Sequence, residues 1–347
     1  MDDKKKKIII WLASPMGDAI LSTPALRAIR KHFSSARIYF FAKPLIRQIL
    51  SPGNFNDHWL DKTCDNPFKI AGMLKQHKFT HAILLKNSFA SALAVFLAKI
   101  PIRIGYAREG RALLLNQKLY PPKLTNGSFK PVSALDYYLA IASWLGGDVS
   151  QRDTELQLDP QAKHSLNAKL PQSDKPSVIL VPGGAFGPSK CWPSQRFAKV
   201  ADWLIENYNA EIFVSVSPDQ AEITIANEIC QAGKHELINL GQKQLTIAEL
   251  KSLFSRASLV ISNDTGPRHI AIALKRKIVT LFGPNNPAWT ENGYEDEIKI
   301  IGTGPCVPCD KPKCKKDQHI CMDSITVEMV VQAAKKLLDK NNCQENL

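Results

Sequence analysis

The sequence lacks any hydrophobic run long enough to cross a membrane. Its longest apolar stretches, residues 8–13 and 90–98, fall well short of the ~20 residues that a spanning helix needs. The first stretch follows a polar start and is closed by Pro15, too early for the core of a signal peptide. We therefore expect a cytoplasmic protein.

The sequence also lacks the glycine-rich motif of dinucleotide-binding proteins and the common nucleic-acid-binding motifs. After the first apolar stretch a dinucleotide-binding protein would carry G-x-G-x-x-G, but Gly17 is the single glycine of this turn. The next strand would end at an acid, and Lys43 stands there instead. These departures argue against a dehydrogenase. Helix-turn-helix, RNP and basic-zipper patterns are absent as well, so nucleic acid is not an expected partner.

Acidic residues are scarce in the first half of the chain. Residues 1–160 hold 23 Lys and Arg against 12 Asp and Glu, a net charge of +11, whereas residues 161–347 hold 22 against 20, a net +2. Such an excess suits a polyanion or an anionic membrane surface, and it also fits an ordinary solvated surface. A phosphorylated glycolipid would match it.

What is present is an alternation of short apolar runs and amphipathic helical patterns over 347 residues, which predicts an α/β protein with parallel strands in two domains. The expected strands are 8–13, 37–42, 82–85, 103–106, 177–181, 211–216, 259–262 and 278–282. The expected helices are 19–33, 44–50, 90–99, 134–145, 194–208, 220–232, one that starts at a capping box at Thr246, 267–274 and 326–338. The expected domains are 1–155 and 177–325, with a linker at 156–176 and a C-terminal helix and tail at 326–347.

An aspartate occupies the turn after the first expected strand. Asp18 stands at the start of the following helix, where a carboxylate caps free backbone amides. A carboxylate kept ionised by a helix end can also accept a proton, so Asp18 is a candidate general base. Both interpretations remain open from the residues alone.

Two turns of the second half are compatible with a bound anion. In residues 260–274, Asp264, Thr265 and Gly266 lead into a helix, and the free amides at its start can hold a phosphate, with His269 about one turn further on. In residues 181–193, a rigid loop with three glycines carries one charge, Lys190, which could neutralise a diphosphate leaving group. A plain capped turn and a solvated lysine are the alternatives.

Three stretches together resemble glycosyltransferase family 9, the ADP-heptose:lipopolysaccharide heptosyltransferases. "GDAILSTPALRAIRKHF" is similar to the family's opening motif and "SNDTGPRHIA" to its donor-binding motif. "PGGAFGPSKCWP" is similar to the loop found in the branch that transfers the second heptose, and Ala185-Phe186 replace the hydroxyl residues of the first-heptose branch.

The resemblance implies a GT-B fold of two Rossmann-like domains facing across a cleft, the first for the glycolipid acceptor and the second for ADP-heptose. It implies an inverting reaction without a metal, and the chain has no D-x-D motif. Asp18 matches the general base and Lys190 the lysine that contacts the diphosphate. The donor site would comprise Asp264, Thr265, Gly266 and His269, with softer matches at Leu245 for adenine and Glu222 for ribose.

Four of the eight cysteines are clustered in "CVPCDKPKCKKDQHIC": Cys306, Cys309, Cys314 and Cys321. Four thiols within 16 residues could bind a structural zinc ion, but the spacing is not that of a standard zinc finger, and a reduced loop without metal is equally compatible. A catalytic metal is not expected, because Asp18, Lys190 and a helix end already supply the required groups.

The resulting hypothesis is an enzyme that transfers L-glycero-D-manno-heptose from ADP-heptose to the first heptose of a lipopolysaccharide inner core. Its partners would be the nucleotide sugar, the core acceptor and, peripherally, the cytoplasmic face of the inner membrane. A family 9 enzyme with another acceptor or donor sugar is one alternative. A noncatalytic protein that binds a sugar nucleotide is another.

Overall fold

The structure is a computed structural model that describes residues 6–316 and 319–340. The chain forms two compact units. The first comprises the chain up to Gln157 together with Ala288–Asn292, and the second comprises Leu158–Pro287 and the chain from Gly293 onward. The segment 288–292 is bound to the first unit in part by the hydroxyl of Ser133, which donates to the backbone oxygen of Glu291.

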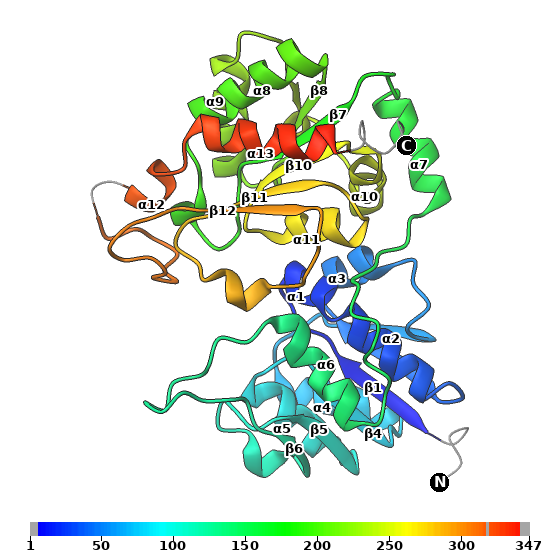
Figure 1. Cartoon of the computed structure of the whole chain (residues 1–347). Coiled ribbons are helices and arrows are strands. Elements are labelled where there is room, and N and C mark those ends of the chain that lie inside the picture. Colours follow the sequence, from blue (N-terminus) through cyan, green and yellow to red (C-terminus); the bar gives the residue numbers. More distant parts are fainter. Residues whose placement is uncertain (1–5, 317–318, 341–347) are drawn as a thin grey trace. The chain divides into compact units, whose positions relative to one another are not determined.

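The first unit contains a six-stranded parallel sheet with helices on both faces (Figure 1). Its strand order is β3 (His58–Asp61), β2 (Arg37–Ala42), β1 (Lys7–Trp11), β4 (His81–Leu84), β5 (Ile102–Tyr106) and β6 (Gln117–Leu119). In the central register Ile10 pairs with Phe40 of β2 and with Ile83 of β4. This is the order of a Rossmann sheet, and the direction of winding changes between β1 and β4.

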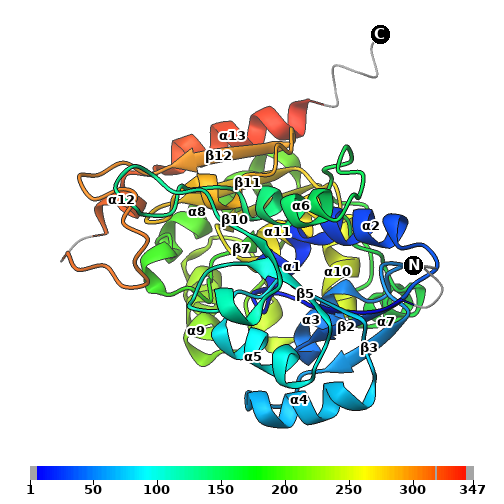
Figure 2. The same ribbon diagram turned by 90° about the horizontal axis from the view of Figure 1, so that it is seen from below.

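The helices of the first unit are α1 (Met16–Leu21), α2 (Thr23–His32), α3 (Pro44–Leu50), α4 (Pro67–Gln76), α5 (Phe89–Leu97) and α6 (Ala134–Trp144), with a short 3₁₀ turn η2 (Ala112–Leu114). Alternate residues of β1 enclose a core with α4 and α5, where Ile9 and Trp11 pack with Leu74 and Val95. Figure 2 shows α4 and α5 together on one side of the strands and α2 with α6 on the other.

The second unit repeats this design. Its parallel sheet has the order β12 (Glu297–Ile301), β11 (Ile278–Phe282), β10 (Leu259–Asn263), β7 (Ser177–Val181), β8 (Glu211–Val214) and β9 (Ile238–Asn239), with the change of direction between β7 and β10. The helices are α7 (Pro160–Lys169), α8 (Ser194–Tyr208), α9 (Gln220–Ala232), α10 (Ile247–Arg256), α11 (Gly266–Ala273), α12 (Ile320–Asp323) and α13 (Val327–Asp339), and the 3₁₀ turns are η3 (Pro188–Lys190), η4 (Leu240–Gln242) and η5 (Pro287–Thr290), which extends into the segment 288–292. The prediction of two Rossmann-like α/β units is confirmed. Helix α7 lies within the expected linker and belongs to the second unit.

The prediction of one helix over residues 19–33 is wrong. The helix begins earlier, at Met16, and is interrupted at Ser22 between α1 and α2. Pro24 has no N–H to donate to the carbonyl of Ile20, and the hydroxyl of Thr23 donates to that oxygen instead, at 2.8 Å. The break therefore leaves α1 as a short helix that carries Asp18 in its first turn.

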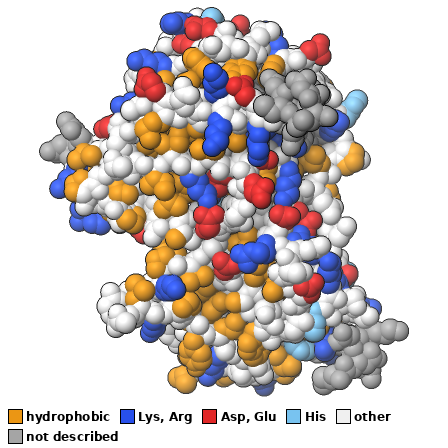
Figure 3. Space-filling model, in the orientation of Figure 1, with side chains coloured by type: hydrophobic (Ala, Val, Ile, Leu, Met, Phe, Trp, Pro, Cys, Tyr) orange, Lys and Arg blue, Asp and Glu red, His pale blue; other side chains and the backbone are white. Residues whose placement is uncertain are grey.

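Large hydrophobic side chains are exposed more often on the first unit than on the second. Nine of those found among the described residues belong to the first unit and five to the second. Figure 3 shows hydrophobic side chains interspersed with charged ones over the face that it draws. No helix within the described ranges combines the length and apolarity needed to cross a bilayer.

Candidate active site

A pocket of about 260 Å³ lies in the first unit where the winding of the sheet changes direction. Ligands of open parallel sheets bind at this position because the loops that follow the two central strands diverge there. Asp18 is one of its lining residues, which are Ala13, Ser14, Pro15, Asp18, Leu85, Lys86, Asn87 and Tyr138. A second pocket, of about 390 Å³, surrounds Leu237 in the other unit and includes none of the predicted site residues.

Asp18 is held by a tyrosine from a distant helix. The sequence allowed Asp18 to be a capping residue, but it lies within the first turn of α1 and makes no capping bond. The hydroxyl of Tyr138 in α6 donates to its Oδ1 at 3.1 Å. Burial raises the pKa of Asp18, and the hydrogen bond from Tyr138 lowers it without cancelling the effect. A carboxylate with a raised pKa is a stronger base than an exposed one, which suits proton abstraction near neutral pH.

Three lysines follow strands β2, β3 and β4 near this pocket, with β1 lying between β2 and β4 in the sheet. Lys43 follows β2, Lys62 follows β3 and Lys86 comes two residues after β4. Lys62 donates a hydrogen bond to Asp65, and this bond, together with the charges of Lys62, Lys43 and Lys86, lowers the pKa of Asp65. Burial, followed by the charge of Lys62, lowers the pKa of Lys86. The carboxyl edge of this sheet is therefore cationic and suited to an anionic group.

A buried arginine fixes the turn that carries Lys86. Arg111 is fully buried and donates to the backbone oxygens of Tyr106 and Lys86, at 2.9 and 2.5 Å, and to Oδ1 of Asn87 at 2.7 Å. Burial lowers the pKa of Arg111 to about 10, so it remains charged at neutral pH. Arg111 thus holds two consecutive residues of the loop between β4 and α5.

The anion-compatible turns of the second unit also meet where its sheet changes direction. Asn263, the last residue of β10, donates through Nδ2 to the backbone oxygen of Pro182, at 2.5 Å, in the loop after β7. Helix α11 begins at Gly266, with Pro267 in its first turn. The amides at this helix start have no partner within the helix, which makes the turn a binding position for phosphate.

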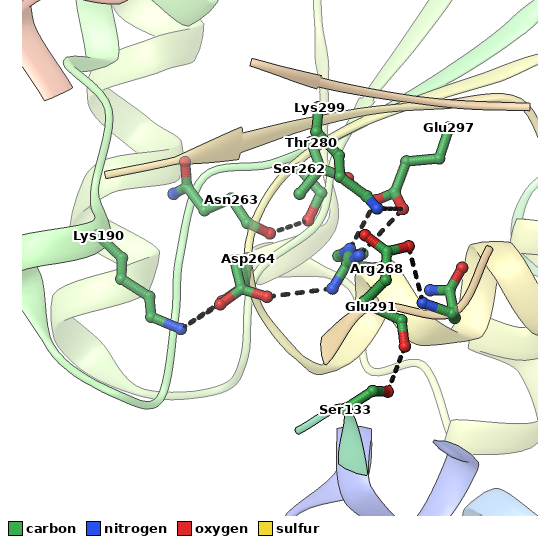
Figure 4. A network of polar contacts seen from close by, with 11 residues as sticks. Ser133, Lys190, Ser262, Asn263, Asp264, Arg268, Thr280, Glu291, Glu297 and Lys299 are labelled. Atoms are coloured by element: carbon green, nitrogen blue, oxygen red, sulfur yellow. Dashed lines mark hydrogen bonds and ion pairs between the residues drawn. The ribbon is translucent and has the colours of Figure 1, made fainter. Parts of the chain in front are cut away.

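Lys190 and Asp264 form a buried ion pair beside this turn (Figure 4). Nζ of Lys190 donates to Oδ2 of Asp264 at 2.8 Å and to its backbone oxygen at 2.7 Å, and Arg268 lies 3.3 Å from Oδ1. Burial by itself would raise the pKa of Asp264, but Lys190 and Arg268 outweigh it and the pKa is lowered. Asp264 therefore orients the two cations, and its part in donor binding stays a prediction.

The same network reaches β12 through Glu297. Arg268 donates two parallel bonds to this carboxylate, from Nε at 2.6 Å and from the terminal nitrogen Nη2 at 2.9 Å, and Thr280 of β11 donates a third. Both side chains of the Arg268–Glu297 pair are fully buried. This pair fixes the guanidinium, which in turn fixes one oxygen of Asp264.

His269 is buried and neutral. Burial, followed by the charge of Arg268, lowers its pKa to about 3. Within the part of the chain that the structure describes, its Nδ1 and Oδ1 of Asn263 are buried without a hydrogen-bond partner. His269 can therefore offer a ligand a hydrogen bond but no positive charge near neutral pH.

Glu222, from the first turn of α9, supports the glycine loop after β7. It accepts hydrogen bonds from the backbone amides of Gly184, at 3.1 Å, and Ser217, at 2.8 Å. A Cβ at Gly183 would approach the carboxylate to 2.3 Å, so a larger residue there would displace the Glu222 side chain from its present position. Leu245 is half-buried just before Thr246, whose capping box with Glu249 starts α10 as predicted. The ribose and adenine contacts of Glu222 and Leu245 stay predictions.

The cysteine cluster gains no support as a zinc site. Among the described residues, which include Cys306, Cys309, Cys314 and Cys321, no three His, Cys, Asp or Glu side chains are arranged to hold a metal ion. Cys321 is buried in the core of the second unit, and burial raises the pKa of its thiol.

The family model of glycosyltransferase family 9 (heptosyltransferase) matches residues 68–320. The chain belongs to glycosyltransferase family 9. It is 29% identical over 334 residues to lipooligosaccharide heptosyltransferase 2 of Campylobacter jejuni, covering 95% of this chain and 99% of the relative. It is 30% identical over 307 residues to lipopolysaccharide heptosyltransferase 2 of Escherichia coli K12, covering 82% and 84%. The solved structure of Escherichia coli ADP-heptose heptosyltransferase II has the same fold, with a TM-score of 0.78, 24% identity and coverage of 97% and 99%.

Sequence reasoning missed several residues that build the site. Tyr138 and the three lysines stand in no motif and come together only through the fold. Arg268 lies inside the quoted stretch "SNDTGPRHIA", so the motif contained it, but nothing in the sequence pairs it with Glu297, 29 residues further on.

Proposed function

We propose that this family 9 glycosyltransferase transfers L-glycero-D-manno-heptose from ADP-heptose to the first heptose of a lipopolysaccharide inner core. The observation that carries the proposal is the position of Asp18, a carboxylate with a raised pKa in a pocket at the switch point of the first unit. The names of the relatives that cover most of the chain agree with transfer of a heptose and with this acceptor class, and the name of the similar solved structure includes ADP-heptose.

Asp18 is the general base of the proposed reaction. As the acceptor hydroxyl oxygen bonds to the anomeric carbon of the heptose, its proton passes to a carboxylate oxygen of Asp18. The bond between that carbon and the ADP oxygen breaks, and attack from the opposite side inverts the anomeric configuration. Tyr138 keeps the accepting carboxylate oriented.

The second unit binds ADP and stabilises it as a leaving group. The amides of Thr265 and Gly266 at the start of α11 hold the phosphate oxygens, and Lys190 neutralises the charge that develops on the diphosphate. Asp264 orients Lys190 by accepting hydrogen bonds from its Nζ at the carboxylate and at the backbone oxygen. With these groups in place the reaction does not require a metal ion, so a chelator leaves turnover unchanged.

The lysine edge of the first unit, formed by Lys43, Lys62 and Lys86, binds the anionic part of the acceptor. Inner-core glycolipids carry phosphates and acidic sugars. Lys86, which lines the pocket with Asp18, supplies complementary charge, and Lys43 and Lys62 lie close enough to Lys86 to act on its pKa. The acceptor is membrane-anchored, so we place the protein peripherally at the cytoplasmic face of the inner membrane.

The experiment is a transfer assay with ADP-heptose and two truncated cores, one without heptose and one that carries a single heptose, with the product read by mass. We expect addition of one heptose to the second core alone. Transfer only to the heptose-free core would overturn the acceptor assignment, and transfer to neither would overturn the function.

The variant Asp18→Asn tests whether Asp18 is the general base. Asp18→Asn should lower kcat by roughly 10²–10⁴-fold while ADP binding and the circular dichroism spectrum stay unchanged. Asp148→Asn, a substitution of an exposed aspartate in the same unit, is the matched control. Unchanged turnover in Asp18→Asn would contradict the catalytic role, and retained binding with no transfer in the wild type would favour a noncatalytic sugar-nucleotide-binding protein.

A further inference from the structure

An ordered hairpin leaves the first unit directly after β6. Residues 120–130 fold back on themselves through an antiparallel bridge between Lys123 and Phe129. Backbone bonds run from Leu124 to Ser128, at 2.8 Å, and from Lys130 to Pro122, at 3.0 Å, and Gly127 turns the tip with a positive φ of 82°. The segment is built by its own hydrogen bonds and is not a loose connection. In Figure 1 it projects at the lower left of the unit.

The hairpin exposes three large hydrophobic side chains. Tyr120 is 71% exposed, Leu124 42% and Phe129 37%. Every residue from Pro122 to Lys130 is exposed, so these side chains contribute nothing to the core of the unit. Soluble proteins bury such residues or use them to contact a partner, and a short hairpin that presents three of them calls for a partner.

The charge around these side chains is of one sign. Residues 110–135 contain Arg111, Lys118, Lys123 and Lys130 and no acidic residue. Arg111 is buried, whereas Lys123 and Lys130 are exposed on the hairpin itself. The ring of Phe129 lies 4.3 Å from the guanidinium of Arg108 and 5.9 Å from the ammonium of Lys123, so cations lie next to the apolar surface. Orange and blue side chains also adjoin at this projection in Figure 3.

Hydrophobic and aromatic side chains beside lysines are the combination that binds an anionic lipid surface. Tyrosine, phenylalanine and leucine partition into the boundary between head groups and acyl chains, and lysines are attracted by anionic head groups. A protein partner with an acidic groove would meet the same charge, but it would have to match the positions of the apolar side chains and of the lysines, whereas a lipid surface accepts them without a matching shape, which favours the membrane.

We propose that the hairpin 120–130 docks the protein on an anionic phospholipid membrane, with Tyr120, Leu124 and Phe129 entering the interface and Lys123 and Lys130 contacting the head groups. The inference deepens the proposed function, because it names the surface by which an enzyme with a lipid-anchored acceptor reaches its substrate. It assigns a role to exposed residues that the transfer reaction does not use.

The test is sedimentation of the full chain with vesicles of phosphatidylcholine alone and of phosphatidylcholine mixed with phosphatidylglycerol. We expect binding to the mixed vesicles and little to the neutral ones. The double variant Tyr120→Ser/Leu124→Ser should bind the mixed vesicles at least about tenfold more weakly, because its apolar contact is lost. Lys123→Gln and Lys130→Gln should each weaken binding about fivefold.

The matched control is Met329→Ser, because Met329 in α13 of the second unit is 43% exposed, close to the exposure of Leu124. Its vesicle binding should equal that of the wild type. Equal binding by the double variant and the wild type, or no binding by the wild type, would overturn the proposal. So would a concentration-dependent dimer that the double variant abolishes, since the hairpin would then be an interface between two copies of the chain.

The result is separable from that of the transfer assay. With a core acceptor that lacks acyl chains, the hairpin variants should turn over at the wild-type rate, because the acceptor then needs no membrane. If no variant and no wild-type sample transfers heptose, the proposed function is lost, but vesicle binding still decides the role of the hairpin.

Discussion

Two side chains 120 residues apart share one hydrogen bond in the pocket of the first unit. The hydroxyl of Tyr138 donates to Asp18, and Tyr138 is itself buried, so that its own pKa is raised well above 10, first by burial and then by the charge of Asp18. Tyr138 therefore stays protonated and acts only as a donor. A donor to a carboxylate stabilises the charged form and lowers its pKa.

Removing this donor should move the pH dependence of the reaction. In Tyr138→Phe the pKa of Asp18 rises further, since burial remains and the opposing bond is gone. The base is active when deprotonated, so the acid limb of the kcat profile should shift to higher pH. Lys86, which lines the same pocket, is not altered in this variant, so the shift reports the loss of the Tyr138 hydroxyl.

Tyr137→Phe is the control, because the hydroxyl of this neighbouring tyrosine is bonded to Asn87 and not to Asp18. Its profile should keep the wild-type acid limb. If both variants lose activity equally at every pH, Tyr138 has a structural role and does not tune the base.

For single residues, the sequence could predict which site residues follow a strand, but not which distant side chains they contact. Asp18 and Gly266 could be found because a strand, a turn and a helix start are consecutive in the chain. The pairing of Asp18 with Tyr138 depends on how α6 packs against α1, and that packing has no local signal. For the same reason Lys190 could be proposed for a diphosphate, whereas its ion pair with Asp264 could not be foreseen.

The turn between β10 and α11, the proposed site for the donor phosphates, is held in place by one buried ion pair. Glu297 of β12 accepts two hydrogen bonds from Arg268 of α11, and neither side chain is exposed. Glu297→Ala leaves the guanidinium buried with part of its charge uncompensated. We expect a loss of about 3–5 kcal/mol in the free energy of unfolding, measured by urea denaturation.

Asp296 provides a comparison one residue away. It pairs with Lys340 at 2.6 Å, but both side chains are more than a third exposed. Asp296→Ala should therefore cost at most about 1 kcal/mol. Equal losses in the two variants would contradict the structural importance of the Arg268–Glu297 pair.

The regular elements were largely predictable, and the exceptions have physical causes. Residues 37–42, 177–181, 194–208 and 278–282 have the predicted bounds, because the apolar periodicity ends at a charged residue, a proline, a glycine or, after α8, the left-handed Asn209. All four edge strands were missed. Strands β3, β6 and β9 are short with an incomplete apolar pattern, and the apolar run of β12 is interrupted by Lys299.

At the scale of the whole molecule, the excess of positive charge belongs to the first half of the chain, at +11 against +2. Under the proposed function this excess attracts the anionic acceptor. Lys86 lines the pocket and is only partly buried, so salt should screen its attraction. Lys190, by contrast, is 8% exposed and already paired, so its contribution to donor binding should respond less to salt.

The two substrates should therefore differ in their response to ionic strength. Raising the salt from low to physiological concentration should increase KM for an anionic core acceptor several-fold, with a smaller change in KM for ADP-heptose and in kcat, because the Debye length falls to about 8 Å. Lys86→Gln should raise the acceptor KM at low salt and flatten its salt dependence, whereas Lys163→Gln, a substitution on the exposed surface of α7, should do neither. Steady-state kinetics at a series of salt concentrations measures both effects. A donor KM that rises more steeply than the acceptor KM would place the charge recognition in the second unit and contradict the assignment of the lysine edge to the acceptor.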